Sequence, residues 1–297
     1  MKPAPFEYYA PSSVDEALDL LAEHGYDVKI LAGGQSLVPS MNFRLAVPPA
    51  ILDLNFIPEL SYIRPTDEGG VVIGTMTRDV DVEYDEYVYE HFPVIREAMH
   101  FVAHPQIRNR GTFGGAIAHA DPTAQMPAVV VALKGQMLIR SKSGERWVPC
   151  DEFFMGPFTT SLNYDEMLVE VALPPMAPRS GASYQQMERQ AGAQALVGGV
   201  AAVSLDQDGN AQDVRLVLCS VGEIPTLAVK AAEVLIGKKP TPELIAEAAA
   251  VAAAEDVDPG GDIHCSVEFR RHLVEVISRR ALSQAFERAH NEGASHD

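Results

Sequence analysis

Cysteine is scarce in this sequence. The chain of 297 residues contains three cysteines, Cys150, Cys219 and Cys265, which are far apart, and no CxxC pair occurs. Zinc and iron–sulfur sites need several closely spaced thiolate ligands, so no metal or cluster site is expected within this chain. A disulfide framework is equally unexpected, as is typical of a protein that functions in the reducing cytoplasm.

Basic residues and long apolar runs are also lacking. The chain has 23 Lys and Arg against 41 Asp and Glu, which gives a net charge of -18. Nucleic acid is therefore not expected as the main partner, because phosphate binding needs a basic face. The run AQALVGGVAAVSL is too short to span a membrane, and the segment MKPAPFEYYAPSS lacks the apolar core of a signal peptide. The remaining possibility is a globular chain long enough for two domains or one large one.

The hydrophobic pattern predicts a mixed, α+β organisation in the first part of the chain. Ser13 and Glu16 have the spacing of a capping box, and apolar residues follow at helical spacing from Val14 to Leu21. Further helices are expected at 77–87, 91–103 and 123–133. Strands are expected at 28–31, 50–54, 71–74, 136–140 and 167–173.

A change of pattern follows the segment PPMAPRSG, residues 174–181, which has the composition of a linker. Strands are then expected at 183–188, 199–205 and 214–221, with a hairpin turn at Asp208, Gly209 and Asn210. Helices are expected at about 227–236, 242–255 and 267–289. The predicted domains are 1–176, with subdomains of about 1–55 and 56–176, then 177–290 and a tail at 291–297.

Two glycine pairs stand out because each is surrounded by hydrogen-bond donors. The first glycine segment (Ala32–Ser36, AGGQS) directly follows a strand, and the second glycine segment (Thr112–Gly115, TFGG) follows Arg108 and Arg110. Such segments can aim successive backbone N–H groups at an anion, and glycine lets a phosphate come close. A simple turn remains the alternative for each. A GxGxxG fingerprint is absent from both, which argues against a Rossmann site.

Four longer segments carry a resemblance to a known family: AGGQSLVPSMNFRLAVPPAILDLN, IGTMTRDVDVE, IRNRGTFGGAIAHADPTAQMPAVVVAL and FTTSLNYDEMLVEVALPP. The chain resembles the FAD-binding medium subunit of molybdenum hydroxylases from about residue 3 to about residue 288. The pattern is most similar to the aerobic carbon monoxide dehydrogenase type and less similar to the flavin domain of xanthine dehydrogenase. The resemblance implies a two-subdomain FAD-binding module of the vanillyl-alcohol-oxidase type, followed by a small domain of antiparallel sheet plus helices.

The resemblance also implies which residues hold FAD. It implies a pyrophosphate clamp formed by Ala32, Gly33, Gly34, Gln35 and Ser36 together with Thr112, Phe113, Gly114 and Gly115, and an apolar lining from Leu31 and Leu162. On this basis, Gly114→Val is expected to abolish FAD retention by blocking the approach of the backbone to the cofactor.

Three departures from the family pattern concern the flavin site. Gln125 stands where an acid is common, and it can still bond a ribose or ribityl hydroxyl. Ala193 stands where an acid often follows R-x-x-G, and Gln185 with Gln186 stands where a lysine is frequent. These changes bear on the potential and accessibility of the flavin more than on its binding.

The resemblance implies an electron-transfer role with no catalytic acid, base or metal ligand in this chain. A small subunit would carry two [2Fe-2S] clusters and a large subunit the molybdenum cofactor, in a dimer of heterotrimers. The flavin would pass electrons to a quinone, NAD or oxygen. The expected location is the cytoplasm, with attachment to the inner membrane through the complex as an alternative.

Two other functions remain open. A stand-alone flavin oxidase or dehydrogenase would need its own base near the ring, for which Tyr8, Tyr9 and His119 are the candidates. A scaffold subunit without FAD would be consistent with the departures at Gln125 and Ala193, but the intact glycine segments argue against it. In this family the substrate is chosen at the molybdenum subunit, so this sequence does not define it.

Overall fold

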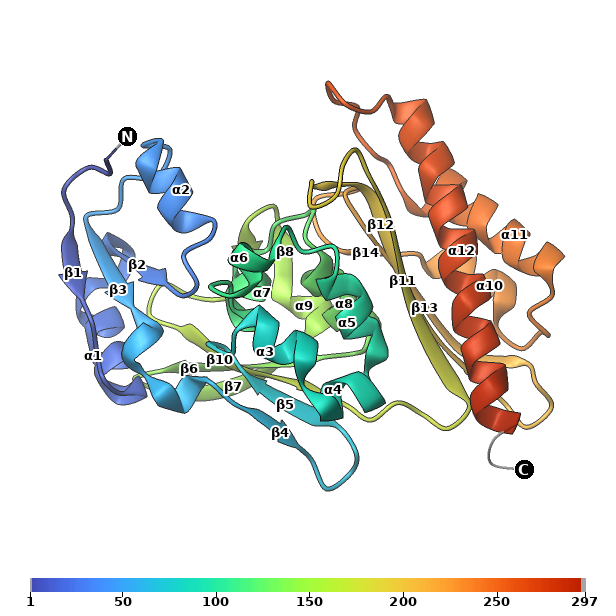
Figure 1. The fold of residues 1–297 in the computed structure, drawn as a ribbon, viewed down its shortest axis with the longest axis horizontal. Coiled ribbons are helices and arrows are strands. Elements are labelled where there is room, and N and C mark those ends of the chain that lie inside the picture. Colours follow the sequence, from blue (N-terminus) through green and yellow to red (C-terminus); the bar gives the residue numbers. More distant parts are fainter. Residues whose placement is uncertain (1, 295–297) are drawn as a thin grey trace.

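The computed structural model describes residues 2–294 and arranges three main sheets in a row from the N-terminal to the C-terminal part (Figure 1). Parallel pairing is confined to the first sheet, and the other two are antiparallel. Helices pack against each sheet instead of alternating regularly with parallel strands. The α+β prediction is therefore confirmed.

The N-terminal sheet has the strand order β1-β3-β2. Its helix begins after Ser13, whose Oγ accepts a hydrogen bond from the N–H of Glu16 at 3.2 Å, as predicted. The carboxylate of Glu16 accepts from the N–H of Ser12, one residue earlier than in a standard capping box. The elements are β1 (Glu7–Tyr9), α1 (Val14–His24), β2 (Val28–Leu31), α2 (Leu37–Asn42) and β3 (Ala50–Asp53), with 3-10 turns at Gly25–Asp27, Leu54–Phe56 and Pro58–Leu60.

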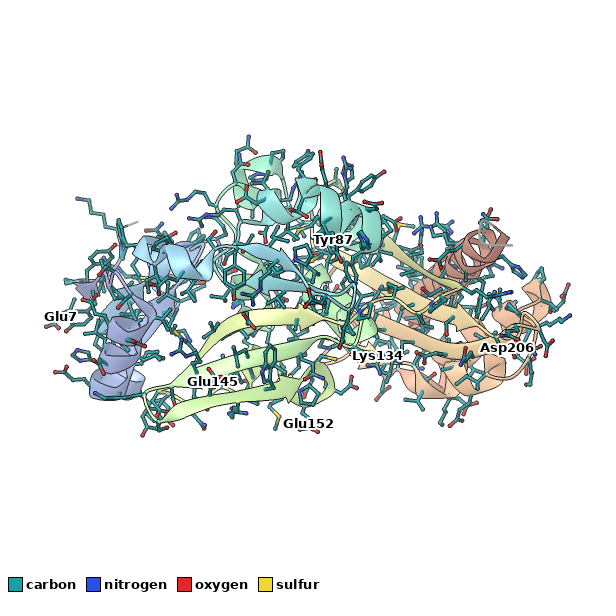
Figure 2. All side chains as sticks on the ribbon, turned by 90° about the horizontal axis from the view of Figure 1, so that it is seen from below. Glu7, Tyr87, Lys134, Glu145, Glu152 and Asp206 are labelled. Carbon is teal, nitrogen blue, oxygen red and sulfur yellow. The ribbon has the colours of Figure 1, made fainter. Side chains whose placement is uncertain are left out.

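The central sheet has the order β4-β5-β10-β6-β7 and is covered by helices on one face. Figure 2 shows this helical layer, marked by Tyr87, above the strands, marked by Glu145. The strands are β4 (Ile63–Pro65), β5 (Val71–Gly74), β6 (Gln136–Ser141), β7 (Gly144–Pro149) and β10 (Met167–Leu173), and a small sheet pairs β8 (Phe154–Gly156) with β9 (Thr159–Thr160). The helices are α3 (Asp79–Tyr84), α4 (Glu86–His91), α5 (Pro93–Met99), α6 (Pro105–Arg108), α7 (Phe113–His119), α8 (Gln125–Ala132) and α9 (Cys150–Phe153).

Two helix predictions in this part were too long. The expected helix 77–87 is divided into α3 and α4 at Asp85, which is extended and accepts a hydrogen bond from the N–H of Val88 at 2.9 Å. The expected helix 91–103 is shortened to α5, which starts at Pro93. An aspartate N-cap and a proline at the first helical position are both local signals of a new helix start.

The C-terminal sheet is buried on both faces. Along β12, Val200 belongs to the core that it shares with α8, while Ala201 packs in the core formed with α12, which crosses β11 and β12 (Figure 1). The two parts of the chain therefore meet through a continuous apolar core. The elements are β11 (Ser180–Glu188), β12 (Ala195–Leu205), β13 (Ala211–Cys219), β14 (Thr226–Leu227), α10 (Val229–Leu235), α11 (Pro242–Val251), a π-helical turn (Ala252–Asp256) and α12 (Val267–Ala294).

The strands of this sheet begin earlier than the sequence suggested. Gly198 and Gly199 lie inside β12, where a Cβ on Gly198 would lie 2.6 Å from the sulfur of Cys219 and one on Gly199 would lie 3.0 Å from Ile277. These two positions need glycine because neighbouring side chains pack closely against the strand, not because the chain turns there. The hairpin turn predicted at Asp208–Asn210 is confirmed, with Gly209 at φ +82°.

Candidate FAD site

The two glycine segments lie against each other. A Cβ on Gly33 would collide with the carbonyl oxygen of Arg110 and would lie 2.7 Å from the Cα of Gly111. A Cβ on Gly115 would lie 3.3 Å from the Cβ of Ala32. Segments that are distant in the sequence thus meet at two points, and both contacts require the small size of glycine.

A polar bridge holds this junction together. The guanidinium of Arg78 donates to Oδ1 of Asn55 at 2.6 Å and to the carbonyl of Arg110 at 2.5 Å. Asn55 in turn donates to the carbonyl of Ala32 at 2.9 Å, and Arg78 forms an isolated β-bridge with Thr112. Sequence reasoning missed Arg78 and Asn55. The signal available was that both lie within the segments that carry the family resemblance, directly after strands β5 and β3.

The first glycine segment presents unused donors. The backbone N–H groups of Gly33, Gly34, Gln35 and Ser36 donate no hydrogen bond to any group among the described residues. Gly34 has φ +75°, a conformation that favours glycine, and the side chain of Gln35 closes the turn by donating to the carbonyl of Gly33 at 2.8 Å. Consecutive free N–H groups around a left-handed residue form an anion-binding nest.

The second glycine segment differs, because its donors are already used. Thr112 caps α7, and the N–H groups of Phe113, Gly114 and Gly115 donate to the carbonyl of Thr77, the carbonyl of Thr75 and Oγ1 of Thr112 at 2.9, 3.1 and 3.2 Å. The segment predicted as a loop is therefore the first turn of a short helix. By packing against the first glycine segment, it holds that segment in place.

Gly114 is required by the protein's own packing. A Cβ at this position would lie 2.5 Å from the Cα of Thr75, which follows β5. The expectation that Gly114→Val would act by blocking the approach of the cofactor is therefore corrected: the first atoms that a side chain would meet belong to Thr75. The side chain of Phe113 is likewise fully buried in the core, so only the backbone of this residue faces the junction.

A buried ionic layer lies beneath the second segment. Arg108 is buried and its Nε donates to Glu83 at 2.7 Å, so it is not the free basic group that the sequence suggested, whereas Arg110 is exposed. Asp79 donates its N–H to the carbonyl of Gly111 at 3.1 Å, and its Oδ1 is buried without a partner. Burial raises the pKa of Asp79 to about 7, although Arg108 and Arg78 act to lower it.

Two of the sequence departures are partners of each other. Gln125 is buried at the start of α8, and its Nε2 donates to Oε1 of Gln186 at 3.1 Å and to the carbonyl of Phe101 at 3.3 Å. The same oxygen of Gln186 accepts from the hydroxyl of Tyr184 at 2.7 Å. The Oε1 of Gln125 accepts no hydrogen bond from the described residues. Gln125 and Gln186 are 61 residues apart in the sequence, so the sequence alone did not indicate that they form a pair.

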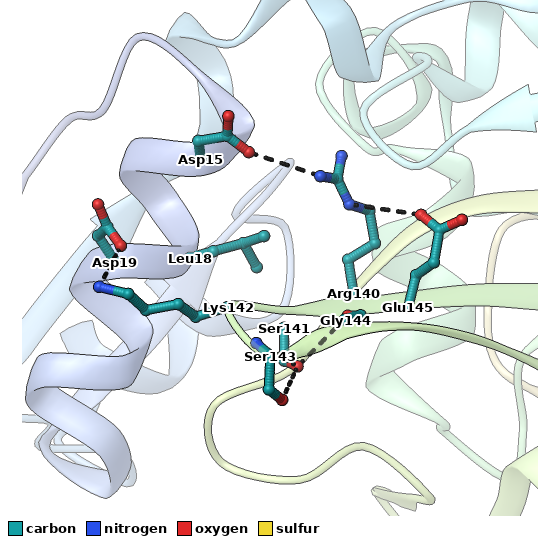
Figure 3. Close-up of a pocket in the computed structure, with 9 residues that line it drawn as sticks. All are labelled: Asp15, Leu18, Asp19, Arg140, Ser141, Lys142, Ser143, Gly144 and Glu145. Carbon is teal, nitrogen blue, oxygen red and sulfur yellow. Dashed lines mark hydrogen bonds and ion pairs between the residues drawn. The ribbon is translucent and has the colours of Figure 1, made fainter.

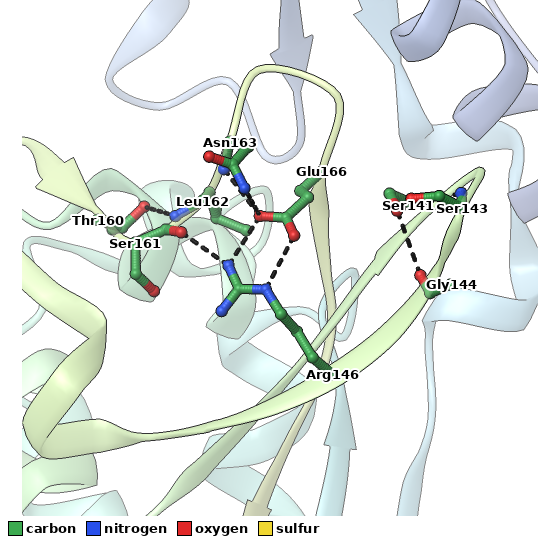
Figure 4. Close-up of polar contacts among 9 residues, drawn as sticks. All are labelled: Ser141, Ser143, Gly144, Arg146, Thr160, Ser161, Leu162, Asn163 and Glu166. Atoms are coloured by element: carbon green, nitrogen blue, oxygen red, sulfur yellow. Dashed lines mark hydrogen bonds and ion pairs between the residues drawn. The ribbon is translucent and has the colours of Figure 1, made fainter.

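The apolar residues of the predicted site are half-buried. Leu31 ends β2 and lies next to Gly34, where a Cβ would be 3.1 Å from its Cδ1. Leu162 packs at the edge of the central core on a segment that Arg146 holds in place (Figure 4). Arg146 makes two hydrogen bonds to Glu166, at 2.9 and 2.8 Å, and one to the carbonyl of Ser161 at 2.8 Å. This pairing lowers the pKa of Glu166.

Two of the candidate bases of the alternative function, Tyr8 and Tyr9, are poorly suited to that role. Tyr8 donates its hydroxyl to Asp53 at 2.6 Å, and this bond raises its pKa to about 12. Tyr9 donates to Glu7, which also raises its pKa. His119 ends α7, and burial lowers its pKa; its ring lies 5.1 Å from that of Phe158. A phenol whose pKa is raised keeps its own proton at neutral pH, so it cannot accept another as a general base.

One cavity lies apart from this junction, between α1 and the hairpin of β6 and β7 (Figure 3). Both of its cations are paired, because Arg140 contacts Asp15 and Glu145 while Lys142 contacts Asp19 at 2.7 Å. These ion pairs at the surface contribute little to stability, and they leave no cation free to bind an anionic ligand.

Comparison with known proteins decides the family. Residues 4–176 match the family model described as "FAD binding domain in molybdopterin dehydrogenase", and residues 182–285 match "CO dehydrogenase flavoprotein C-terminal domain". The chain belongs to this family. It is an FAD-binding oxidoreductase subunit of the molybdenum hydroxylase type.

Similar proteins match nearly its whole length. The chain is 38% identical to the 6-hydroxypseudooxynicotine dehydrogenase complex subunit alpha of Paenarthrobacter nicotinovorans, over 97% of each chain. It is also 38% identical to the carbon monoxide dehydrogenase medium chain of Hydrogenophaga pseudoflava, over 97% of this chain and 99% of that one. A solved structure of that carbon monoxide dehydrogenase superimposes with a TM-score of 0.93 at 37% identity, again over 97% and 99% of the two chains.

These matches confirm the predicted family, the flavoprotein fold and the assignment to oxidoreductases. No helix within residues 2–294 is both long and apolar enough to cross a membrane.

Proposed function

We propose that the chain carries FAD within a heterotrimeric molybdenum hydroxylase, where it takes electrons from [2Fe-2S] clusters on a small subunit and passes them to an external acceptor. The observation that carries the proposal is the row of unpartnered backbone donors at Gly33, Gly34, Gln35 and Ser36. A pyrophosphate offers the acceptor oxygens that such a nest binds. Bound FAD would supply the redox chemistry.

The remaining predicted residues have supporting roles in this proposal. Ala32 with the second glycine segment, Thr112, Phe113, Gly114 and Gly115, holds the nest in place. Gln125 is anchored through its Nε2, so its free Oε1 is available to a ribose or ribityl hydroxyl. Leu31 and Leu162 would contribute apolar surface to the ring systems.

The partners are proposed from the relatives. Several are named as the medium chain or as the alpha or beta subunit of a dehydrogenase, and this chain spans nearly their full length. We infer that it pairs with a small [2Fe-2S] subunit and a large molybdenum-cofactor subunit, as a dimer of heterotrimers in the cytoplasm. A quinone, NAD or oxygen would be the acceptor.

The test is the composition of the complex. An affinity-tagged chain purified from its own cells should bring two further subunits, and the complex should contain iron and molybdenum in addition to flavin. A chain that copurifies with flavin, but with neither metal nor partner, would contradict the proposal and support the stand-alone flavoprotein. The pKa values of Tyr8 and Tyr9 argue against that alternative.

A further inference from the structure

A cavity of about 350 Å³ lies at the end of the β11–β12 hairpin. It is lined by residues of the hairpin, among them Arg189 and Ala193, by Thr123, by Ser220, and by Asp262, His264 and Arg270 of the C-terminal part. Four stretches that are distant in the sequence therefore converge on one cavity. Its volume is in the range of small-molecule sites.

The cavity has a buried cationic wall. Arg270 is only 9% exposed, and it donates to the carbonyl of Gly260 at 2.7 Å and to Asp262. Its Nε is buried without a partner. Buried polar atoms are nearly always hydrogen-bonded, so an unused donor on a buried guanidinium requires an explanation.

A second donor group faces the same space. Arg189 is exposed and its Nη1 donates to Nδ1 of His264 at 2.7 Å. A nitrogen that accepts this bond carries no proton, so the neutral ring holds its proton on Nε2 and offers a further donor there. Ser220, whose backbone has a φ of +66°, also lines the cavity, and its hydroxyl is buried without a partner.

The charge balance of the lining favours an anion. Two guanidinium groups, Arg189 and Arg270, stand against one carboxylate, Asp262, which is already bound by Arg270 and by the N–H groups of His264 and Cys265. This local excess of positive charge occurs in a chain whose net charge is -18. The planar guanidinium groups of arginine, together with hydroxyl and imidazole donors, are suited to donate hydrogen bonds to the oxygens of a phosphate group.

We propose that this cavity binds a small molecule through its phosphate group. Ala193 is a determinant of that preference, because this half-buried lining position carries no charge. An acid at this position would bring the lining to neutrality and repel the ligand. The site uses none of the backbone donors of the proposed pyrophosphate nest. Ala193 belongs to the segment whose departure from the family pattern concerns the flavin, so the test below separates phosphate binding from FAD binding.

The test is calorimetric titration of the full-length, FAD-loaded chain at constant ionic strength with inorganic phosphate, AMP and chloride. Phosphate should bind and chloride should not; tighter binding of AMP would identify a nucleotide as the source of the phosphate, and equal binding would indicate a free phosphate. Ala193→Asp should weaken phosphate binding by about tenfold or more. The size-matched neutral variant Ala193→Asn should stay within about twofold of the wild type. Arg189→Gln, at an exposed position, should weaken it as Ala193→Asp does.

Three results would overturn the proposal. One is the absence of phosphate binding above the chloride level. Another is binding that neither Ala193→Asp nor Arg189→Gln weakens, which would place the anion elsewhere. The third is release of FAD by phosphate in proportion to its binding, which would make the arginine wall part of the cofactor site. If the chain carries no FAD, the same titration on the FAD-free chain tests the cavity separately.

Discussion

The contact between the two glycine segments predicts that one methyl group at Gly33 will weaken FAD binding. In Gly33→Ala, the new Cβ would lie 2.7 Å from the Cα of Gly111 and closer still to the carbonyl oxygen of Arg110. Both neighbours are backbone atoms, so neither can turn away as a side chain would. The segments must separate by several tenths of an ångström, which moves the free N–H groups of the nest.

The magnitude follows from the cost of overpacking. Inserting a methyl group into a well-packed contact typically costs about 1–3 kcal/mol. If FAD binding requires the segments to close fully, that cost appears as a loss of affinity of about 5–150-fold. If the apo chain already carries the overpacking strain, relaxation of that chain relieves part of the cost. The rest of the cost then lowers its free energy of unfolding.

The assay is a fluorescence titration of FAD into the apo chain, accompanied by urea unfolding of the same preparation. Gly156→Ala is the matched control, because a Cβ there would lie 4.0 Å from its nearest neighbour, the Cβ of Thr159, and Gly156 is not in the left-handed region. We expect the control to retain wild-type affinity. Wild-type FAD affinity in Gly33→Ala would refute the coupling between the segment contact and the cofactor.

Three further predictions concern Gly114, Asp79 and Gln125. Gly114→Val should lower the free energy of unfolding of the apo chain by several kcal/mol through its collision with Thr75, measured by urea unfolding; a stable variant that has lost only FAD would contradict this reading. The pKa of Asp79 is raised to about 7, so its stabilising contribution is complete below about pH 4 and lost as the pH passes 7. Between about pH 4 and pH 7 the free energy of unfolding of the wild type should fall by on the order of 4 kcal/mol more than that of Asp79→Asn. Urea unfolding at several pH values measures this difference, and the same pH dependence in both proteins would disprove the prediction. Gln125→Leu removes the bond to Gln186 and should cost about 1 kcal/mol of stability and up to about tenfold in FAD affinity; unchanged values of both would show that neither role is real.

Local signals in the sequence were sufficient for much of the fold. The helix after Ser13, the hairpin turn around Gly209 and strands β2, β3, β5, β6 and β10 were predictable, whereas β1, β4, β7, β8 and β9 were not expected. Capping and turn residues are predictable because they act on their immediate neighbours. The predicted start of this strand at Gly199 was too late, because β12 begins at Ala195, and glycines at 198 and 199 admit Cys219 and Ile277 from other elements. The hydrophobic periodicity of a strand carries no information about such a contact with another element.

The two glycine segments were predictable as an unusual feature, but their separate roles were not. Both glycine segments were recognised as unusual, and the structure brings them into contact. Their different roles were hidden, because only the structure shows that Thr75 and Thr77 already accept the N–H groups of the second segment. The bridge from Arg78 to Asn55 was hidden for the same reason: it joins side chains from separate loops.

The central claim is that this chain holds FAD. Its most direct test is the visible absorption spectrum of the purified chain after incubation with FAD, with identification of the cofactor released on acid precipitation. The account predicts a yellow protein that releases FAD, and a loss of that colour in Gly33→Ala but not in Gly156→Ala. A folded chain that stays colourless, both alone and when co-expressed with its partner subunits, would contradict it.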